Sequence, residues 1–214
     1  MKTTYKHLGL TALAVALAGC AMAPTSQQVD EATQRIIKSS FTEKGIAKLD
    51  RLELDESNRA CSESQGQPLE PKLAQAIEAA NLKTVKMPSD GKFLGDWKAG
   101  EKLAQNGRGL TWTDKPGDAN GGSCYNCHQI SKEELSFGSI GPSLYHYGKL
   151  RGVTDPSSPA SKPIVEYTWS KLWNAKAFNA CSGMPRFGHA GILNESQLRD
   201  VMALLLDPKS PVNQ

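Results

Sequence analysis

Cys124-Tyr125-Asn126-Cys127-His128 follows the pattern C-x-x-C-H, which is the signal for covalent attachment of c-type haem. Two thiols at this spacing can add to the two vinyl groups of one porphyrin. The next residue, His128, can then give an imidazole nitrogen to the iron. The motif therefore predicts one covalently bound haem c, attached through Cys124 and Cys127 and ligated by His128.

Two other kinds of site use the same cysteine spacing, a redox-active cysteine pair and half of a zinc site. A zinc site needs two further ligands at similar spacing, and the sequence has no second Cys-x-x-Cys. A thioredoxin-like pair needs a βαβ setting, which the flanking sequence does not offer. Haem attachment is therefore the favoured interpretation.

A second motif, Gly141-Pro142-Ser143-Leu144, begins thirteen residues after His128. It resembles the Gly-Pro-x-Leu loop that lies on the histidine side of the ring in monohaem class I cytochromes c. In that family a backbone carbonyl of the loop accepts a hydrogen bond from the histidine Nδ1–H, which fixes the tautomer and raises the basicity of the ligand. We expect the same bond from His128.

Met184 is the predicted second iron ligand. It lies in a loop between two expected helices, and Pro185 disfavours helical geometry at the preceding residue. Of the other candidates, Met202 falls in the apolar stripe of the last helix, His146 follows the Gly-Pro loop on the proximal side, and His189 remains an alternative to Met184. Ligation by histidine and methionine leaves iron six-coordinate and raises its potential, which suits electron transfer.

The region from residue 93 to 214 is predicted to form the haem domain. Helices are expected over residues 96–107, 165–178 and 194–206, with Asn194 as the N-cap of the last one and Gln197 at its N3 position. Gly100 would allow close contact between helices. The large aromatic residues of the middle helix are expected to pack on the porphyrin: Trp169, Trp173 and Phe178.

Residues 20–92 are predicted to form a helical extension, and no group of residues in it suggests a catalytic site. Imperfect helical spacing runs over residues 27–54, with a break near Gly45, and a short helix is expected over residues 73–82. Residues 62–71 and 87–91 have loop and turn composition. We interpret the extension as a structural wrap around the haem domain, and a partner-docking surface is the alternative.

Residues 1–19 have the pattern of a signal peptide, with Lys2 and Lys6 followed by a ten-residue apolar run that is too short to span a bilayer. The run ends in Leu17-Ala18-Gly19-Cys20, which resembles a bacterial lipobox and makes Cys20 the first residue of a lipidated mature chain. Cleavage after Ala21-Met22-Ala23 is the alternative. Either way, we expect an exported, periplasmic protein, and a lipid at Cys20 would attach it to a membrane.

Without the leader, the 214-residue chain keeps 23 basic and 22 acidic residues. It has no basic run, so the sequence gives no sign of a nucleic-acid partner. Cys61 and Cys181 are left over once the haem cysteines and Cys20 are assigned. Because haem is attached outside the cytoplasm, where disulfides persist, we predict a disulfide between them, with two unpaired thiols as the alternative.

Four stretches of the haem domain resemble the SoxX family, the monohaem subunits of SoxAX cytochrome complexes. They are residues 123–152, 165–175, 181–188 and 204–213, and the extension matches only loosely. The resemblance implies a SoxA-like partner that carries the catalytic haem. It also implies a complex that joins thiosulfate oxidatively to a carrier cysteine of SoxY in SoxYZ, and a small cytochrome that accepts the electrons. The matching haem residues are Cys124, Cys127, His128 and Met184.

The sequence therefore predicts a mainly α protein, a class I cytochrome c-like haem domain with an N-terminal helical extension. The expected function is electron acceptance within an L-cysteine S-thiosulfotransferase of the SoxAX type. A stand-alone, lipid-anchored electron carrier is the first alternative. A haem sensor or peroxidase is the second, and it would need an open position on the iron.

Overall fold

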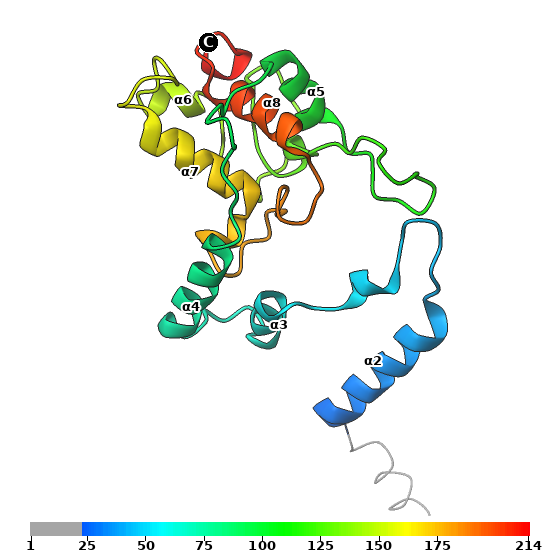
Figure 1. Ribbon diagram of the computed structural model, residues 1–214. Coiled ribbons are helices and arrows are strands. Elements are labelled where there is room, and N and C mark those ends of the chain that lie inside the picture. The colour runs from blue at the N-terminus through cyan, green and yellow to red at the C-terminus, as the bar shows by residue number, and fades with distance from the viewer. Residues whose placement is uncertain (1–22) are drawn as a thin grey trace, which may run out of the picture. The chain divides into compact units, whose positions relative to one another are not determined.

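The computed structural model describes residues 23–214 (Figure 1). In this range the regular elements are helices, and the only β pairing is an isolated bridge between Lys44 and Ala47. The prediction of a mainly α fold is confirmed. None of the helices between residues 23 and 214 has the length and apolarity to cross a membrane. The predicted signal peptide, residues 1–19, and Cys20 lie outside the described residues.

The chain divides into two units, residues 1–42 and residues 43–214. The described part of the first unit contains α2 (Ser26–Ser40), which begins with a capping box between Thr25 and Gln28 and buries no residue. The predicted helical segment over residues 27–54 is therefore shorter than expected. The backbone is already extended at Phe41, and Gly45 takes a positive φ of 54°.

The second unit carries all the other elements. In chain order they are η1 (Leu49–Leu52), α3 (Glu56–Glu63), α4 (Pro71–Leu82), α5 (Trp97–Gln105), η2 (Cys124–Asn126), α6 (Tyr147–Leu150), α7 (Lys162–Trp173), η3 (Ala175–Ala177), α8 (Glu195–Leu206) and η4 (Pro211–Asn213). The sequence did not predict α3 or α6. Helix α3 buries only Ser57, so it has no apolar stripe that a periodicity argument could detect.

The core of this unit is built on α8. The predicted capping box between Asn194 and Gln197 is present, and seven residues of the helix are buried. Helix α5 crosses α8 closely at Gly100, where a Cβ atom would lie 2.1 Å from the backbone oxygen of Asp200. The backbone N–H of Gly95 also donates to the carbonyl of Arg199 at 2.9 Å. The expected role of Gly100 in a close helix contact is confirmed.

A Gly100→Val substitution is expected to lower the free energy of unfolding by about 1–3 kcal/mol, because the new side chain would force the two helices apart. Chemical denaturation monitored by circular dichroism measures the change. Lys98→Val is the matched control, since it places the same residue on the exposed side of α5. Equal losses in the two variants would contradict the packing argument.

Residues 43–92 belong to the same unit as residues 93–214, so the structure divides the chain fifty residues before the predicted boundary. Helix α4 packs on η3. Asn174 Nδ2 donates to Asn81 Oδ1 at 2.9 Å, and both side chains are buried. A buried amide pair of this kind fixes the register of the two segments, because each unpaired group would cost about 1–3 kcal/mol. Residues 43–92 are thus packed into the same unit as the predicted haem domain.

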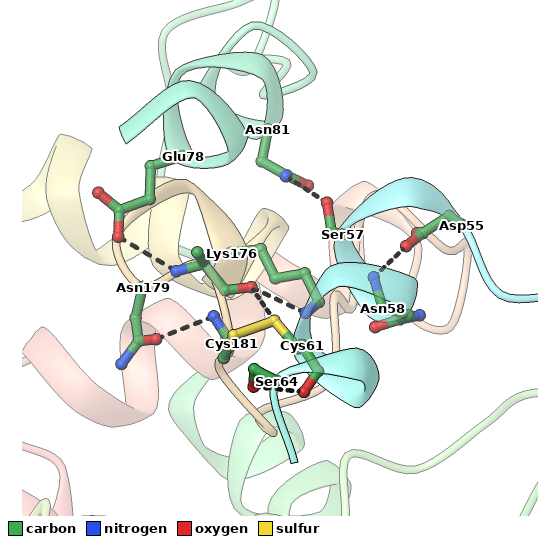
Figure 2. Close-up of a disulfide and its surroundings, with 11 residues drawn as sticks. Asp55, Ser57, Asn58, Cys61, Ser64, Glu78, Asn81, Lys176, Asn179 and Cys181 are labelled. Carbon is green, nitrogen blue, oxygen red and sulfur yellow. Dashed lines mark hydrogen bonds between the residues drawn. A yellow bond between two sulfur atoms is a disulfide. The ribbon is translucent and has the colours of Figure 1, made fainter. Parts of the chain in front are cut away.

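The predicted disulfide between Cys61 and Cys181 is confirmed. It joins α3 to the segment that follows η3, over a sequence separation of 120 residues (Figure 2). A second link lies beside it, an ion pair between Arg186 Nη2 and Asp55 Oδ2 at 2.6 Å. The extension is therefore tied to the segment that contains Met184 both covalently and by charge.

Candidate functional site

A cavity of about 630 Å³ brings together the four predicted site residues. Cys124, Cys127 and His128 line one part of its wall, and Met184 lines another, although 56 residues separate it from His128. The rest of the lining is mostly apolar and comes mainly from α5, α7, α8 and the segments 122–130, 140–151 and 179–187. The volume lies within the usual range of cofactor and ligand sites.

The attachment motif forms a tight turn at η2. The backbone N–H groups of Cys127 and His128 both donate to the carbonyl of Cys124, at 3.1 and 2.9 Å. Ser123 enters the turn with a left-handed φ of 51°. The turn presents both cysteines to one cavity, and neither thiol is in a disulfide.

The segment 138–144 is held against this turn by three backbone hydrogen bonds. The N–H groups of Gly138, Gly141 and Leu144 donate to the carbonyls of Tyr125, Cys127 and Gln129, at distances of 2.7 to 2.8 Å. These bonds fix the Gly-Pro segment beside the imidazole of His128.

His128 Nδ1 lies 2.7 Å from the carbonyl oxygen of Pro142, as predicted from the Gly-Pro-x-Leu motif. A carbonyl oxygen can only accept, so Nδ1 carries the proton and donates it. The Nε2 atom then keeps its lone pair, which is the form of imidazole that binds a metal. The carbonyl also makes the imidazole a stronger donor.

Gly141 makes this contact possible. A Cβ atom at this position would lie 2.2 Å from Cε1 and 2.4 Å from Nδ1 of His128. No side chain larger than hydrogen fits there unless the imidazole moves. The sequence motif indicated the presence of the glycine but not this reason for it.

Gly141→Ala is expected to displace the imidazole of His128 and to lower the free energy of unfolding by roughly 1–3 kcal/mol. Thermal unfolding together with the chemical shifts of the imidazole measures both effects. Gly183→Ala is the control, because it changes another glycine of the same cavity wall that has no heavy atom within 4 Å of its Cβ position. If the imidazole of the Gly141 variant kept its shifts, the steric argument would be wrong.

Burial raises the pKa of the Cys124 thiol to about 12. A redox-active Cys-x-x-Cys pair works in the opposite sense, through a thiolate whose pKa is lowered. The structure thus disfavours the redox-pair alternative. As for the zinc alternative, residues 23–214 contain no group of three or more His, Cys, Asp and Glu side chains arranged to hold a metal ion.

The other candidates for the second iron ligand lie elsewhere. His146 Nε2 is 2.5 Å from the carbonyl of Gln214, and its ring stacks on Tyr145. Met202 is fully buried in the apolar core, as its place in the helical stripe predicted. Neither of them lines the cavity, and nor does His189. Of the four candidates, only Met184 shares the cavity with His128.

The cavity lining gives no support to the expected packing of Trp169, Trp173 and Phe178 on the porphyrin. The indole N–H groups of Trp169 and Trp173 donate to the carbonyls of Lys86 and Thr84, at 2.8 and 3.0 Å. Neither indole lines the cavity, and nor does Phe178. Helix α7 has the cavity on one side and the extension on another, and Trp169 and Trp173 face the extension. Tyr167, against which Phe178 packs, lines the cavity instead.

Two cationic residues that the sequence did not single out also line the cavity, Arg151 and Lys171. The guanidinium of Arg151 lies 3.7 Å from the centre of the Tyr147 ring and donates to the Tyr147 carbonyl. Burial lowers the pKa of Lys171, and the nearby charge of Glu78 opposes that shift. A single cationic residue, such as Arg151 after α6 or Lys171 within α7, carries no sequence signal of a site, so only the fold reveals this pair.

These residues fit a haem c. The two thiols match its vinyl groups, the oriented imidazole and the thioether match its two axial positions, and the apolar wall matches its ring. Arg151 and Lys171 supply positive charge for its two carboxylates.

No family model matches the chain. It is similar to an uncharacterized lipoprotein of Aquifex aeolicus, with 32% identity over 213 residues, which cover 96% of this chain and 98% of that protein.

Proposed function

The chain belongs to the family of this Aquifex lipoprotein, and we propose that it is an exported electron-transfer protein with one covalent haem c. The orientation of His128 carries the proposal. Its Nδ1–H is held by the Pro142 carbonyl, and it lines the same cavity as Cys124, Cys127 and Met184.

Each of these residues has a distinct part in the proposed site. Cys124 and Cys127 would hold the group through thioether bonds, and His128 Nε2 and the Met184 sulfur would bind its iron. When bound, the haem supplies a one-electron couple, and the soft thioether of Met184 favours the ferrous state and raises the potential. With both iron ligands supplied by the chain, the site would transfer electrons and would not bind a substrate at the iron.

We further propose that Cys20 is lipidated after removal of residues 1–19. The lipobox-like sequence and the name of the Aquifex relative support this proposal. A lipid at Cys20 places the haem unit at the periplasmic face of a membrane.

The resemblance to SoxX extends the proposal to a partner and a substrate. The chain would accept electrons from a SoxA-like haem subunit while thiosulfate is joined to the carrier cysteine of SoxYZ, and would pass them to a small cytochrome. The proposed partner and substrate are supported by the resemblance of the four stretches in the haem domain, which include the His128 motif and the Met184 segment.

Purification of the tagged, full-length protein from its natural host grown on thiosulfate tests this proposal. Haem staining and mass spectrometry identify what co-elutes, and absorption spectroscopy follows reduction after thiosulfate and SoxYZ are added. We expect a stoichiometric second haem protein and reduction that depends on thiosulfate. A lone monohaem protein that cycles without such a partner would instead support the stand-alone carrier, and a chain without haem would contradict both functions.

A further inference from the structure

The disulfide between Cys61 and Cys181 lies at the edge of the candidate haem cavity. Cys181 is part of the cavity wall, and it is also exposed to solvent. It precedes Met184 by only three residues. An exposed residue therefore carries a bond that restrains the proposed iron ligand.

The segment 181–185, which carries Met184, is anchored at both ends. At its start, the Ala180 carbonyl accepts from Lys176 Nζ at 2.9 Å and the Ala180 N–H donates to Glu78 at 3.1 Å. At its end, Phe187 is buried in the core.

Within the segment, the N–H groups of Cys181 and Ser182 donate to Asn179 at 3.1 and 3.0 Å, and Met184 packs against the hydrophobic core. The Met184 N–H donates to Ser182 Oγ at 3.3 Å, and Gly183 has no heavy atom within 4 Å of its Cβ position. The disulfide adds a covalent restraint three residues before Met184. The ion pair between Arg186 and Asp55 is a second restraint. It contributes little free energy, because the Asp55 side chain is 41% exposed and water competes for its charge.

We propose that the Cys61–Cys181 disulfide is a redox-active site and that its reduction releases Met184 from the iron. The reductant is a dithiol, from a small molecule or an exported thiol–disulfide oxidoreductase. One of its thiolates attacks Sγ of Cys181, and Cys61 leaves as a thiolate that takes up a proton. The second thiol of the reductant then displaces Cys181, so the protein disulfide gains two electrons and two protons while the dithiol becomes a disulfide.

Exposure of Cys181 favours this reaction, since accessible disulfides are the labile and regulatory ones. Once the bond is open, non-covalent contacts remain between α3 and this part of the chain, the Arg186–Asp55 ion pair and the contact of Cys61 Sγ with the Ala180 carbonyl. The segment then samples arrangements in which the thioether leaves the cavity and an axial position becomes open. This consequence rests on the proposed function, because it requires a haem ligated by Met184.

Carbon monoxide binding to the full-length holoprotein tests the proposal. The haem is first reduced with ascorbate, which leaves disulfides intact, and the protein is then divided and treated with or without dithiothreitol. We expect the association rate to rise at least tenfold after dithiothreitol, while alkylation and mass spectrometry show that Cys61 and Cys181 have become free thiols. A Cys61→Ser/Cys181→Ser variant should bind rapidly without dithiothreitol and show no further response to it.

The outcomes separate this proposal from the one on which it rests. A disulfide that resists dithiothreitol in the folded protein would overturn the redox site, and an opened disulfide with an unchanged rate would overturn its link to Met184. Both results leave the haem function intact. Hydrogen exchange of residues 181–186 with and without dithiothreitol gives a readout that needs no haem, and unchanged protection there would overturn the release of the segment.

Discussion

Replacing Cys124 and Cys127 together by serine is expected to abolish covalent haem attachment. A serine hydroxyl forms no thioether bond to a vinyl group, and His128 and Met184 would then hold the haem only by coordination. Haem staining after denaturing electrophoresis measures the effect, and the expected signal is that of the background.

The control for this variant also removes two cysteines. Cys61→Ser/Cys181→Ser should keep its full haem stain, although loss of the disulfide costs about 2–5 kcal/mol of stability. Covalent haem in the Cys124→Ser/Cys127→Ser protein would refute the attachment site.

A Met184→Ala substitution is expected to open the sixth position of the iron. The reduced variant should bind carbon monoxide at least about tenfold faster than the native protein, which corresponds to about 1.4 kcal/mol in the activation free energy. Its reduction potential should fall, because the thioether no longer stabilises the ferrous state. Flash photolysis and a redox titration measure these two changes.

Met87→Ala is the matched control, since Met87 is 48% exposed and does not line the cavity. It should leave both the rate and the potential unchanged. An unaltered spectrum in the Met184 variant would mean that another side chain ligates the iron, and His189 would be the first to examine.

The parts of the fold that follow from local rules were predictable from the sequence. The capping residues Asn194 and Gln197 marked the start of α8, and the spacing of C-x-x-C-H from Gly-Pro-x-Leu predicted the bond from His128 to the Pro142 carbonyl. The disulfide followed from counting cysteines in an exported chain.

Long-range packing was harder to predict. The pattern of α7 shows that Trp169 and Trp173 are buried, but it does not tell whether a cavity or the extension covers them. Helix α3 is held by the disulfide, the Asp55–Arg186 pair and a hydrogen bond between Asn81 and Ser57, none of which depends on an apolar period. The extension therefore gave a weak sequence signal even where it packs closely.

The positive charge in the cavity was missed for a similar reason. Arg151 and Lys171 are 20 residues apart, and each is unremarkable in its own segment. Only the contact of α6 and α7 with the rest of the unit places both on one wall.

The most direct test of the account is the intact mass of the mature protein, exported from a host that attaches c-type haem and measured after denaturation. We predict the mass of the mature polypeptide plus one haem, with the addition located on the peptide that contains Cys124 and Cys127. A polypeptide without the added haem, in which both thiols react with an alkylating reagent, would contradict the central claim.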